Sequence, residues 1–206
     1  MSKAGEGVAM SPAQWDEGWW WPARRCPSPN QEPRPDPADI SLLVLHAISL
    51  PPGQYGGGEV EALFTNRLDW DAHPYFSGIR GLRVSSHFVI DRAGGVTQFV
   101  PVHQRAWHAG VSSWHGRSNC NDFSVGVELE GLEGGEFTPE QYQRLVHLTR
   151  ALLLVCPRLN DVVGHEHVAP GRKQDPGVGF DWSVYAQALG NTAVAVWPNV
   201  VHSPQE

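Results

Sequence analysis

The segment from Gly164 to Gly177 holds two histidines, a glutamate, a lysine and an aspartate among glycines and prolines. Proline and glycine interrupt regular elements, so the segment is predicted to form a loop. Imidazoles and charges must be hydrated or paired when a loop packs against a protein, so this run does not help folding by itself. Imidazole and carboxylate groups are ligands that suit Zn²⁺. The segment therefore predicts part of a hydrolytic zinc site.

Two histidines lie at the ends of predicted strands. Residues 41–46 form an apolar run that ends in His46, the pattern of a strand buried on both faces. Residues 161–165 form a shorter strand that ends in His165. Sites in open α/β sheets form where strand ends share a crevice, so the two imidazoles are predicted to meet. With Asp175 from the following loop they would give the three-ligand arrangement of a catalytic zinc, which keeps one position open.

Each histidine also has a plainer interpretation, because a histidine at a strand end is more often a hydrogen-bonded structural residue. The combination of the two favours a metal site. His167 is an alternative ligand, since residues 165 and 167 would share one face of a strand that continued. The sequence Ala169-Pro170-Gly171 ends any strand soon afterwards, so His167 is the second choice.

A hydrolytic site also needs a group that transfers protons and a group that stabilises the developing oxyanion. Glu128 lies on the polar face of a strand predicted over residues 123–129, where burial would raise the pKa of its carboxyl group. The plainer interpretation of Glu128 and Glu130 is a solvated strand face. Lys173 lies two residues before Asp175 and could reach a carbonyl oxygen, although alone it is a surface lysine.

The remaining pattern predicts the elements that position these residues. Residues 84–91 alternate in polarity and a second strand returns after a glycine turn, which predicts a hairpin. Thr138 and Gln141 form a capping box with Pro139 at the first helical position. The predicted strands cover 41–46, 84–91, 96–102, 123–129 and 161–165, and the helices cover 59–68, 139–156 and 181–189. Strands intermixed with helices, with at least one hairpin, predict an α/β fold with a mixed sheet.

The chain has 206 residues, of which 41% are hydrophobic, enough for one sizeable core in a single domain. The net charge of −7 and the absence of Lys/Arg runs argue against nucleic acid or an anionic membrane as a partner. Three cysteines without C-x-x-C spacing indicate a reducing compartment. We see no secretory signal and no apolar run long enough to span a bilayer, so a cytoplasmic location is expected.

The N-terminal part of the chain is rich in tryptophan and proline. Residues 22–39 contain several prolines and are expected to form an extended strap rather than a helix. The run Trp19-Trp20-Trp21 is predicted to attach this arm to the core through aromatic area. The alternative is an aromatic platform for a sugar ring.

Several segments, in order along the chain, resemble the zinc-dependent N-acetylmuramoyl-L-alanine amidases of type 2. They are residues 41–46, 48–53, 85–90, 106–110, 120–131 and 164–177. Within that family the chain is similar to the cytoplasmic 1,6-anhydro-N-acetylmuramyl-L-alanine amidases of the AmpD type, whose N-terminal pattern fits residues 16–19 and 23–29. The resemblance implies a peptidoglycan-recognition-protein-like fold, with a central mixed sheet flanked by helices and a zinc site at strand ends in a cleft. It also implies an amidase domain over residues 15–189, between a flexible tip over 1–14 and a tail over 190–206.

The resemblance implies a role for each candidate residue. It makes His46, His165 and Asp175 the ligands of Zn²⁺, Glu128 the proton-handling carboxylate, and Lys173 the residue that stabilises the tetrahedral intermediate. It implies that the substrate cleft is lined by Arg83, His87, Trp107, His108 and Asn121. Two departures from the family pattern concern fine specificity and leave the zinc chemistry intact. Ala47 stands where an asparagine is expected, and Asn119 stands where an arginine is usual.

The resulting hypothesis is a cytoplasmic, monomeric enzyme of peptidoglycan recycling. It would hydrolyse the amide bond between (1,6-anhydro-)N-acetylmuramic acid and L-alanine in a small anhydromuropeptide. Because the chain is acidic and the substrate anionic, arginines such as Arg83, Arg117 or Arg172 would supply local attraction. One alternative is a non-catalytic peptidoglycan-recognition module, which typically lacks a zinc ligand. Another is an amidase that cuts polymeric wall outside the cytoplasm.

Overall fold

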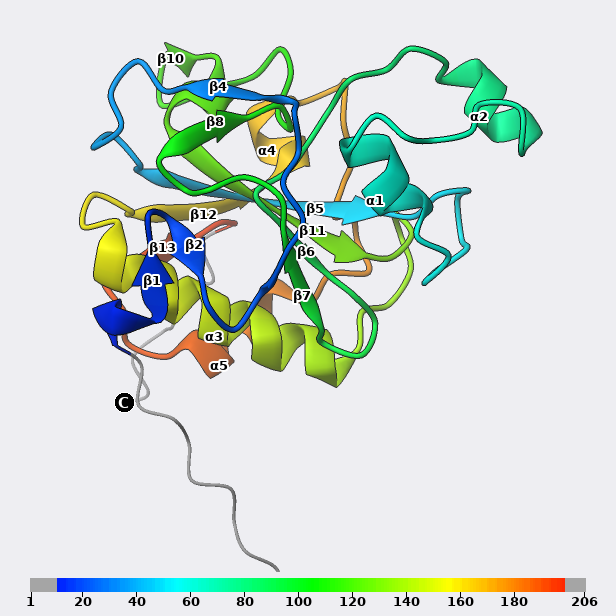
Figure 1. Ribbon diagram of the computed structural model, residues 1–206. Helices are drawn as coiled ribbons and strands as arrows, with labels where there is room; N and C mark the ends of the chain where they lie inside the picture. Colours follow the sequence, from blue (N-terminus) through cyan, green and yellow to red (C-terminus); the bar gives the residue numbers. More distant parts are fainter. Residues whose placement is uncertain (1–10, 199–206) are drawn as a thin grey trace, which may run out of the picture.

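The computed structural model describes residues 11–198, and its centre is a seven-stranded sheet (Figure 1). The strand order is β13-β12-β5-β11-β6-β7-β3. These strands are β3 (Arg24–Arg25), β5 (Leu42–Ile48), β6 (Phe88–Ile90), β7 (Val96–Gln98), β11 (Ser124–Glu130), β12 (Asp161–Gly164) and β13 (Ala195–Val196). Neighbours from β13 to β6 are parallel, whereas β6 and β7 form the predicted antiparallel hairpin. The sheet is therefore mixed, and the predicted fold class is confirmed.

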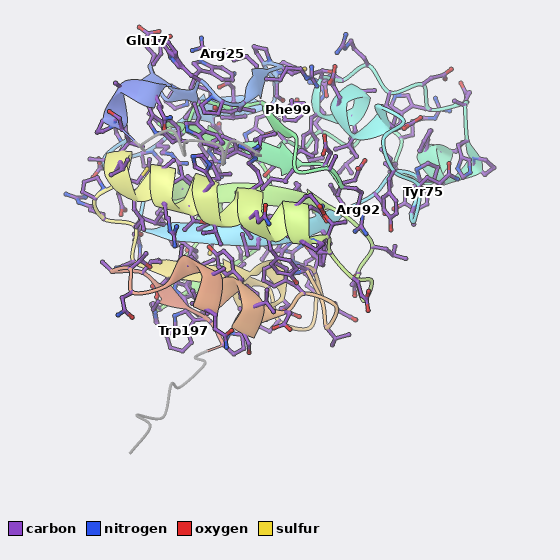
Figure 2. The ribbon with its side chains drawn as sticks, turned by 90° about the horizontal axis from the view of Figure 1, so that it is seen from below. Glu17, Arg25, Tyr75, Arg92, Phe99 and Trp197 are labelled. Atoms are coloured by element: carbon purple, nitrogen blue, oxygen red, sulfur yellow. The ribbon has the colours of Figure 1, made fainter. Side chains whose placement is uncertain are left out.

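Helices flank this sheet. They are α1 (Glu59–Phe64), α2 (Pro74–Gly78), α3 (Pro139–Val155), α4 (His165–Val168) and α5 (Trp182–Leu189), with short 3-10 turns η1 (Pro12–Gln14) and η2 (Cys120–Asp122). α3 packs beside α5 and covers one face of the sheet (Figures 1 and 2). It begins as predicted, since Thr138 and Gln141 form the capping box and Pro139 opens the helix.

The two faces of β5 and β11 have different neighbours. Leu43 and Leu45 belong to the core cluster that includes the buried side of α3. Leu42 and Val44 belong to a second cluster, which contains residues of the loop before β11 and of α4. Successive side chains of a strand point to opposite faces, so His46 continues the face of Leu42 and Val44. The sheet therefore presents His46 away from α3, on the side of the long loops.

Short ladders fasten the loops and the N-terminal arm. The pairs are β1 (Trp15–Asp16) with β2 (Trp19–Trp20), β4 (Gln31–Pro33) with β8 (Gln104–Ala106), and β9 (Ser113–Trp114) with β10 (Arg117–Ser118). Trp20 is fully buried, stacks on Trp15 at 6.3 Å between ring centroids and meets His147 of α3 edge-on at 5.3 Å. The prediction that tryptophan attaches the arm to the core is confirmed for Trp20, whereas Trp21 is exposed.

Several element boundaries differ from the sequence prediction. The helix predicted to reach residue 68 ends at Phe64, because Asn66 adopts a left-handed backbone (φ 58°) that a helix cannot continue through. His165 does not belong to the preceding strand but opens α4. Within the tail predicted from residue 190, β13 pairs with β12, and the outermost residues of the expected tip and tail (1–10 and 199–206) lie outside the described range.

Two further expectations concern cysteines and membranes. Cys26, Cys120 and Cys156 are all free thiols, as the sequence predicts. Among residues 11–198, no helix has both the length and the apolar character needed to cross a bilayer.

Candidate metal centre

The three predicted metal ligands meet at one point. Nδ1 of His46 lies 3.0 Å from Nδ1 of His165, and Oδ2 of Asp175 lies 3.0 and 3.1 Å from these two nitrogens. The sheet register explains the meeting of the histidines, because Gly164, the last residue of β12, pairs with Leu45 of β5, and a histidine follows each of them along the chain. The backbone carbonyl of Asp175 accepts a hydrogen bond from the N–H of Glu166, which ties the loop to α4.

The hydrogen bonds of His165 show which of its nitrogens faces this point. Its Nε2 lies 3.0 Å from the carbonyl oxygen of Ala109, which can only accept, so Nε2 carries the proton. In the neutral imidazole, Nδ1 then presents a lone pair to Asp175 Oδ2. Burial, and next the nearby His165, lower the pKa of His46 to about 4, so the His46 imidazole is neutral at neutral pH.

Two imidazole lone pairs and a carboxylate oxygen at this separation repel one another unless a cation lies between them. Tetrahedral zinc with bonds of about 2.0–2.1 Å would separate its ligand atoms by roughly 3.3 Å, close to the distances found. Burial alone would raise the pKa of Asp175, but the two neighbouring imidazoles outweigh it and lower that pKa, so the carboxyl group is ionised. The residues present therefore fit a divalent metal, and this group could hold one.

Glu128 lies beside this group on the next strand. It is the register partner of His46 across β11 and β5, and its side chain lines the same cavity. Burial raises the pKa of Glu128 well above the ordinary carboxyl value, and the negative charge of Asp175 raises it further, while Lys173 opposes both. A carboxyl group in this state is suited to accept and return a proton near neutral pH.

The group lies in a cavity of about 510 Å³. Lys173 lines this cavity, and its backbone N–H donates to the carbonyl of Ala169, which fixes the loop close to the metal ligands. Tyr75, Ile79 and Leu82, from α2 and the segment after it, form an apolar part of the cavity lining. Tyr75 lies at the outer edge of the molecule (Figure 2). A ligand in the cavity would therefore meet both apolar side chains and the His/His/Asp group.

The residues predicted to line the substrate cleft divide into two sets. Trp107 and His108 line the cavity. Arg83 is exposed, and it is not among the residues that line the cavity within the described part of the chain. His87 is buried, and its Nδ1 accepts a hydrogen bond from the backbone N–H of Gly126 (3.0 Å). Asn121 is buried as well, and its Oδ1 accepts the backbone N–H groups of residues 108 and 109.

The second-choice ligand and the two departures from the family pattern also have defined positions. His167 Nδ1 accepts a hydrogen bond from the backbone N–H of Gly164 (2.8 Å), and His167 is not part of the His/His/Asp group. Ala47 lines the cavity. Asn119 adopts a left-handed backbone (φ 62°), a conformation in which asparagine is enriched. Its side chain accepts a hydrogen bond from Arg105 and donates one to Asp122.

Sequence reasoning missed two features of the site. The apolar part of the lining at α2 has no distinctive motif, since single exposed apolar residues are normal on protein surfaces. Arg34 is buried next to His87, at 3.0 Å from its Nε2, and donates to the carbonyl oxygens of Val102, Asn121 and Ser124. Its only sequence signal is one charge within a proline-rich strap. Burial lowers the pKa of Arg34 to about 10, which leaves it charged at neutral pH.

Comparison with known proteins bears on what this geometry is for. The family described as N-acetylmuramoyl-L-alanine amidase matches residues 36–178. The chain is 54% identical over 169 residues to the 1,6-anhydro-N-acetylmuramyl-L-alanine amidase AmpD of Citrobacter freundii, covering 82% of this chain and 90% of the relative. A crystal structure of a selenomethionine AmpD derivative superposes with a TM-score of 0.82 at 52% identity, covering 84% of this chain and 98% of that one.

A more distant structure contains a bound substrate. The amidase AmiD from E. coli, in complex with anhydro-N-acetylmuramic acid-L-Ala-D-γ-Glu-L-Lys, is 28% identical to this chain with a TM-score of 0.55. The match covers 79% of this chain and 60% of that one.

Proposed function

The chain belongs to the N-acetylmuramoyl-L-alanine amidase family, and we propose that it is zinc-dependent and hydrolyses the amide bond between 1,6-anhydro-N-acetylmuramic acid and L-alanine in peptidoglycan recycling. One observation carries the zinc dependence, namely the convergence of His46 Nδ1, His165 Nδ1 and Asp175 Oδ2. The substrate is proposed from the relatives. Their names give them this specificity, and about half of their residues are identical to those of this chain over most of its length.

The residues of the site have distinct roles in this proposal. His46, His165 and Asp175 hold the zinc ion, which when bound activates water and polarises the amide carbonyl. Glu128 accepts the proton that the attacking water loses as its oxygen bonds to the carbonyl carbon. The Lys173 ammonium stabilises the negative charge that develops on the carbonyl oxygen. As the C–N bond breaks, Glu128 returns the proton to the leaving amine of L-alanine. This transfer restores the Glu128 carboxylate.

The cavity also suits an amphipathic substrate. The lining residues at α2 offer apolar contact, and Arg172 and Lys173, which also line the cavity, offer positive charge to an anionic peptide. Local cations are needed because the chain as a whole carries a net charge of −7. We assign this cavity to a small anhydromuropeptide, in line with the substrate seen in the AmiD complex.

The setting of the reaction is part of the same proposal. Three free thiols suit a reducing compartment, which supports action in the cytoplasm. All residues assigned to catalysis come from one chain, so a monomer is sufficient.

Side-by-side assays on anhydromuropeptide and intact sacculi test the proposal. Mass spectrometry would measure release of the free stem peptide, with the His46→Ala protein as the inactive control. We expect rapid cleavage of the soluble anhydromuropeptide and little release from sacculi. Preferential release from sacculi would make the enzyme an amidase of polymeric wall. Binding of muropeptide without release of peptide would make it a recognition module.

A further inference from the structure

His46 has two ring nitrogens, and each has its own partner. Nδ1 faces His165 and Asp175, as described, whereas Nε2 lies 2.9 Å from Nδ1 of His108. We propose that His108 is a positioning residue, which accepts a hydrogen bond from His46 Nε2–H and thereby holds the His46 imidazole with Nδ1 toward the metal. This inference rests on the metal site of the proposed function. It gives His108 a role other than lining the substrate cleft.

Protons can be assigned without conflict to the hydrogen bonds that join His46, His108 and Ser124. A metal-ligating Nδ1 must keep its lone pair, so the proton of neutral His46 lies on Nε2 and needs an acceptor. His108 Nδ1 is that acceptor, and the proton of His108 then lies on its own Nε2. That nitrogen is 3.1 Å from Ser124 Oγ, which can accept it. Each hydrogen bond in the series from His46 to Ser124 therefore has one donor and one acceptor.

The two metal-ligating histidines differ in how they are held. His165 donates its outer proton to the backbone carbonyl of Ala109, a partner that no side-chain substitution removes. His46 donates to a side chain. Hydrogen bonds to the outer nitrogen of a metal-ligating histidine fix its tautomer and ring orientation. Substitution of His108 therefore tests the positioning of one ligand without touching the other.

The strand below His108 is shaped to receive its ring. A Cβ atom on Gly126 would lie 2.5 Å from Cγ and 2.7 Å from Nδ1 of His108, so only glycine leaves room there. Ser124, Gly126 and Glu128 occupy alternate positions of β11 and therefore share one face. Asn121 Oδ1 accepts the backbone N–H of His108 at 3.1 Å and fixes the start of its side chain. The His108 ring is thus fixed by the Asn121 bond to its backbone, by packing on Gly126, and by hydrogen bonds at both ring nitrogens.

Zinc affinity of matched variants tests this role. His108→Phe keeps a ring but removes the acceptor, and we expect zinc affinity to fall about 10–100-fold. In His108→Asn, Oδ1 takes the place of Nδ1 at the same number of bonds from Cβ, so affinity should remain within a few-fold of the unsubstituted protein. Competition with a chromogenic chelator measures affinity, and the visible absorption of the Co²⁺-substituted proteins reports ligand geometry. Trp107→Phe, a neighbouring change in the cavity, is the control. It should alter neither the zinc affinity nor the Co²⁺ absorption.

The results separate this inference from the proposed function. Weak zinc binding and a changed Co²⁺ spectrum in His108→Phe, with both restored in His108→Asn, would support it. Equal affinity in His108→Phe and the unsubstituted protein would overturn it, as would equal losses in the Phe and Asn variants, while the metal site would stand. If the unsubstituted protein bound no zinc, the metal site and this inference would fall together. If His108→Phe does not fold by circular dichroism, His108→Leu replaces it as the variant without an acceptor.

Discussion

Glu128 and His46 are register partners on the adjacent parallel strands β11 and β5. Paired residues of neighbouring strands lie on the same face of a sheet, about 4.7–4.9 Å apart along the hydrogen-bonding direction. The carboxyl group proposed to transfer protons and one proposed metal ligand are thus both positioned by the central sheet. The other two proposed ligands, His165 and Asp175, come from α4 and the loop that follows it. The sheet therefore sets the distance between Glu128 and His46, and the segment after β12 supplies the rest of the His/His/Asp group.

The pairing leads to a first prediction, for Glu128→Gln. The substitution keeps the size of the side chain but removes its ability to take up a proton, so turnover should fall by about 10²–10⁴-fold. Zinc content should not change, because Glu128 is outside the His/His/Asp group. Turnover on anhydromuropeptide and metal analysis are the measurements. Glu130→Gln, at the next outward position of the same strand face, is the control, and near-normal turnover of Glu128→Gln would move the base elsewhere.

A second prediction concerns which histidines hold the metal. His46→Ala and His165→Ala should each lose most of the bound zinc, whereas His167→Ala should retain it. His167 Nδ1 accepts the backbone N–H of Gly164, so its removal costs stability rather than metal. Metal analysis after gel filtration, with thermal unfolding alongside, distinguishes the two effects. Retention of zinc in His165→Ala together with loss in His167→Ala would reverse the assignment of these ligands.

Much of this arrangement follows from sequence pattern. The apolar run that ends in His46 predicts β5, and the strand predicted over residues 123–129 corresponds to β11. Capping residues predict the start of α3. The meeting of His46 and His165 was predictable because strand ends of an α/β sheet share one edge, and Asp175 was predicted to join them from the following loop. These features depend on local patterns and on a general rule of topology.

The surroundings of the metal group were not predictable in the same way. His87 and Asn121 hydrogen-bond to backbone N–H groups, and nothing in a sequence identifies which distant N–H needs an acceptor. The space above Gly126 is likewise visible only once His108 packs on it. Arg34 binds carbonyl oxygens almost 70 or more residues away along the chain. Such long-range contacts with the backbone have no period or motif.

A third prediction concerns stability and pH in metal-free protein. Burial, and next the charge of Arg34, lower the pKa of His87 well below its ordinary value of 6.5. Below that value the unfolded chain binds a proton at His87 that the folded protein does not, so the free energy of unfolding decreases as pH falls. One such proton changes the slope by about 1.4 kcal/mol per pH unit.

His87→Asn tests this coupling. Asparagine can still accept the Gly126 N–H but does not titrate. The slope of the unfolding free energy against pH should therefore decrease by the contribution of about one proton between roughly pH 5 and pH 6.5. Urea unfolding in the presence of EDTA across this range provides the slope. Identical slopes for the variant and the unsubstituted protein would show that His87 becomes protonated without unfolding.

Lys173 gives the last prediction. Its backbone is fixed two residues before Asp175, and its side chain lines the cavity that holds the metal group. The ammonium would meet negative charge that exists on the carbonyl oxygen only in the transition state, so Lys173→Ala should lower kcat by about 10²–10³-fold with little change in KM. Lys173→Arg should rescue poorly, because the planar guanidinium cannot occupy the place of a compact ammonium.

Steady-state kinetics of both variants on anhydromuropeptide decide the role of Lys173. Loss confined to kcat would place the charge at the reacting carbonyl. Loss confined to KM would make Lys173 a residue that binds the anionic peptide, where arginine serves as well as lysine. Unchanged kinetics would return Lys173 to an ordinary exposed lysine and leave stabilisation of the oxyanion to the metal alone. Because lysine and arginine differ in shape and not in charge, comparison of Lys173→Arg with the unsubstituted protein separates geometry from simple attraction.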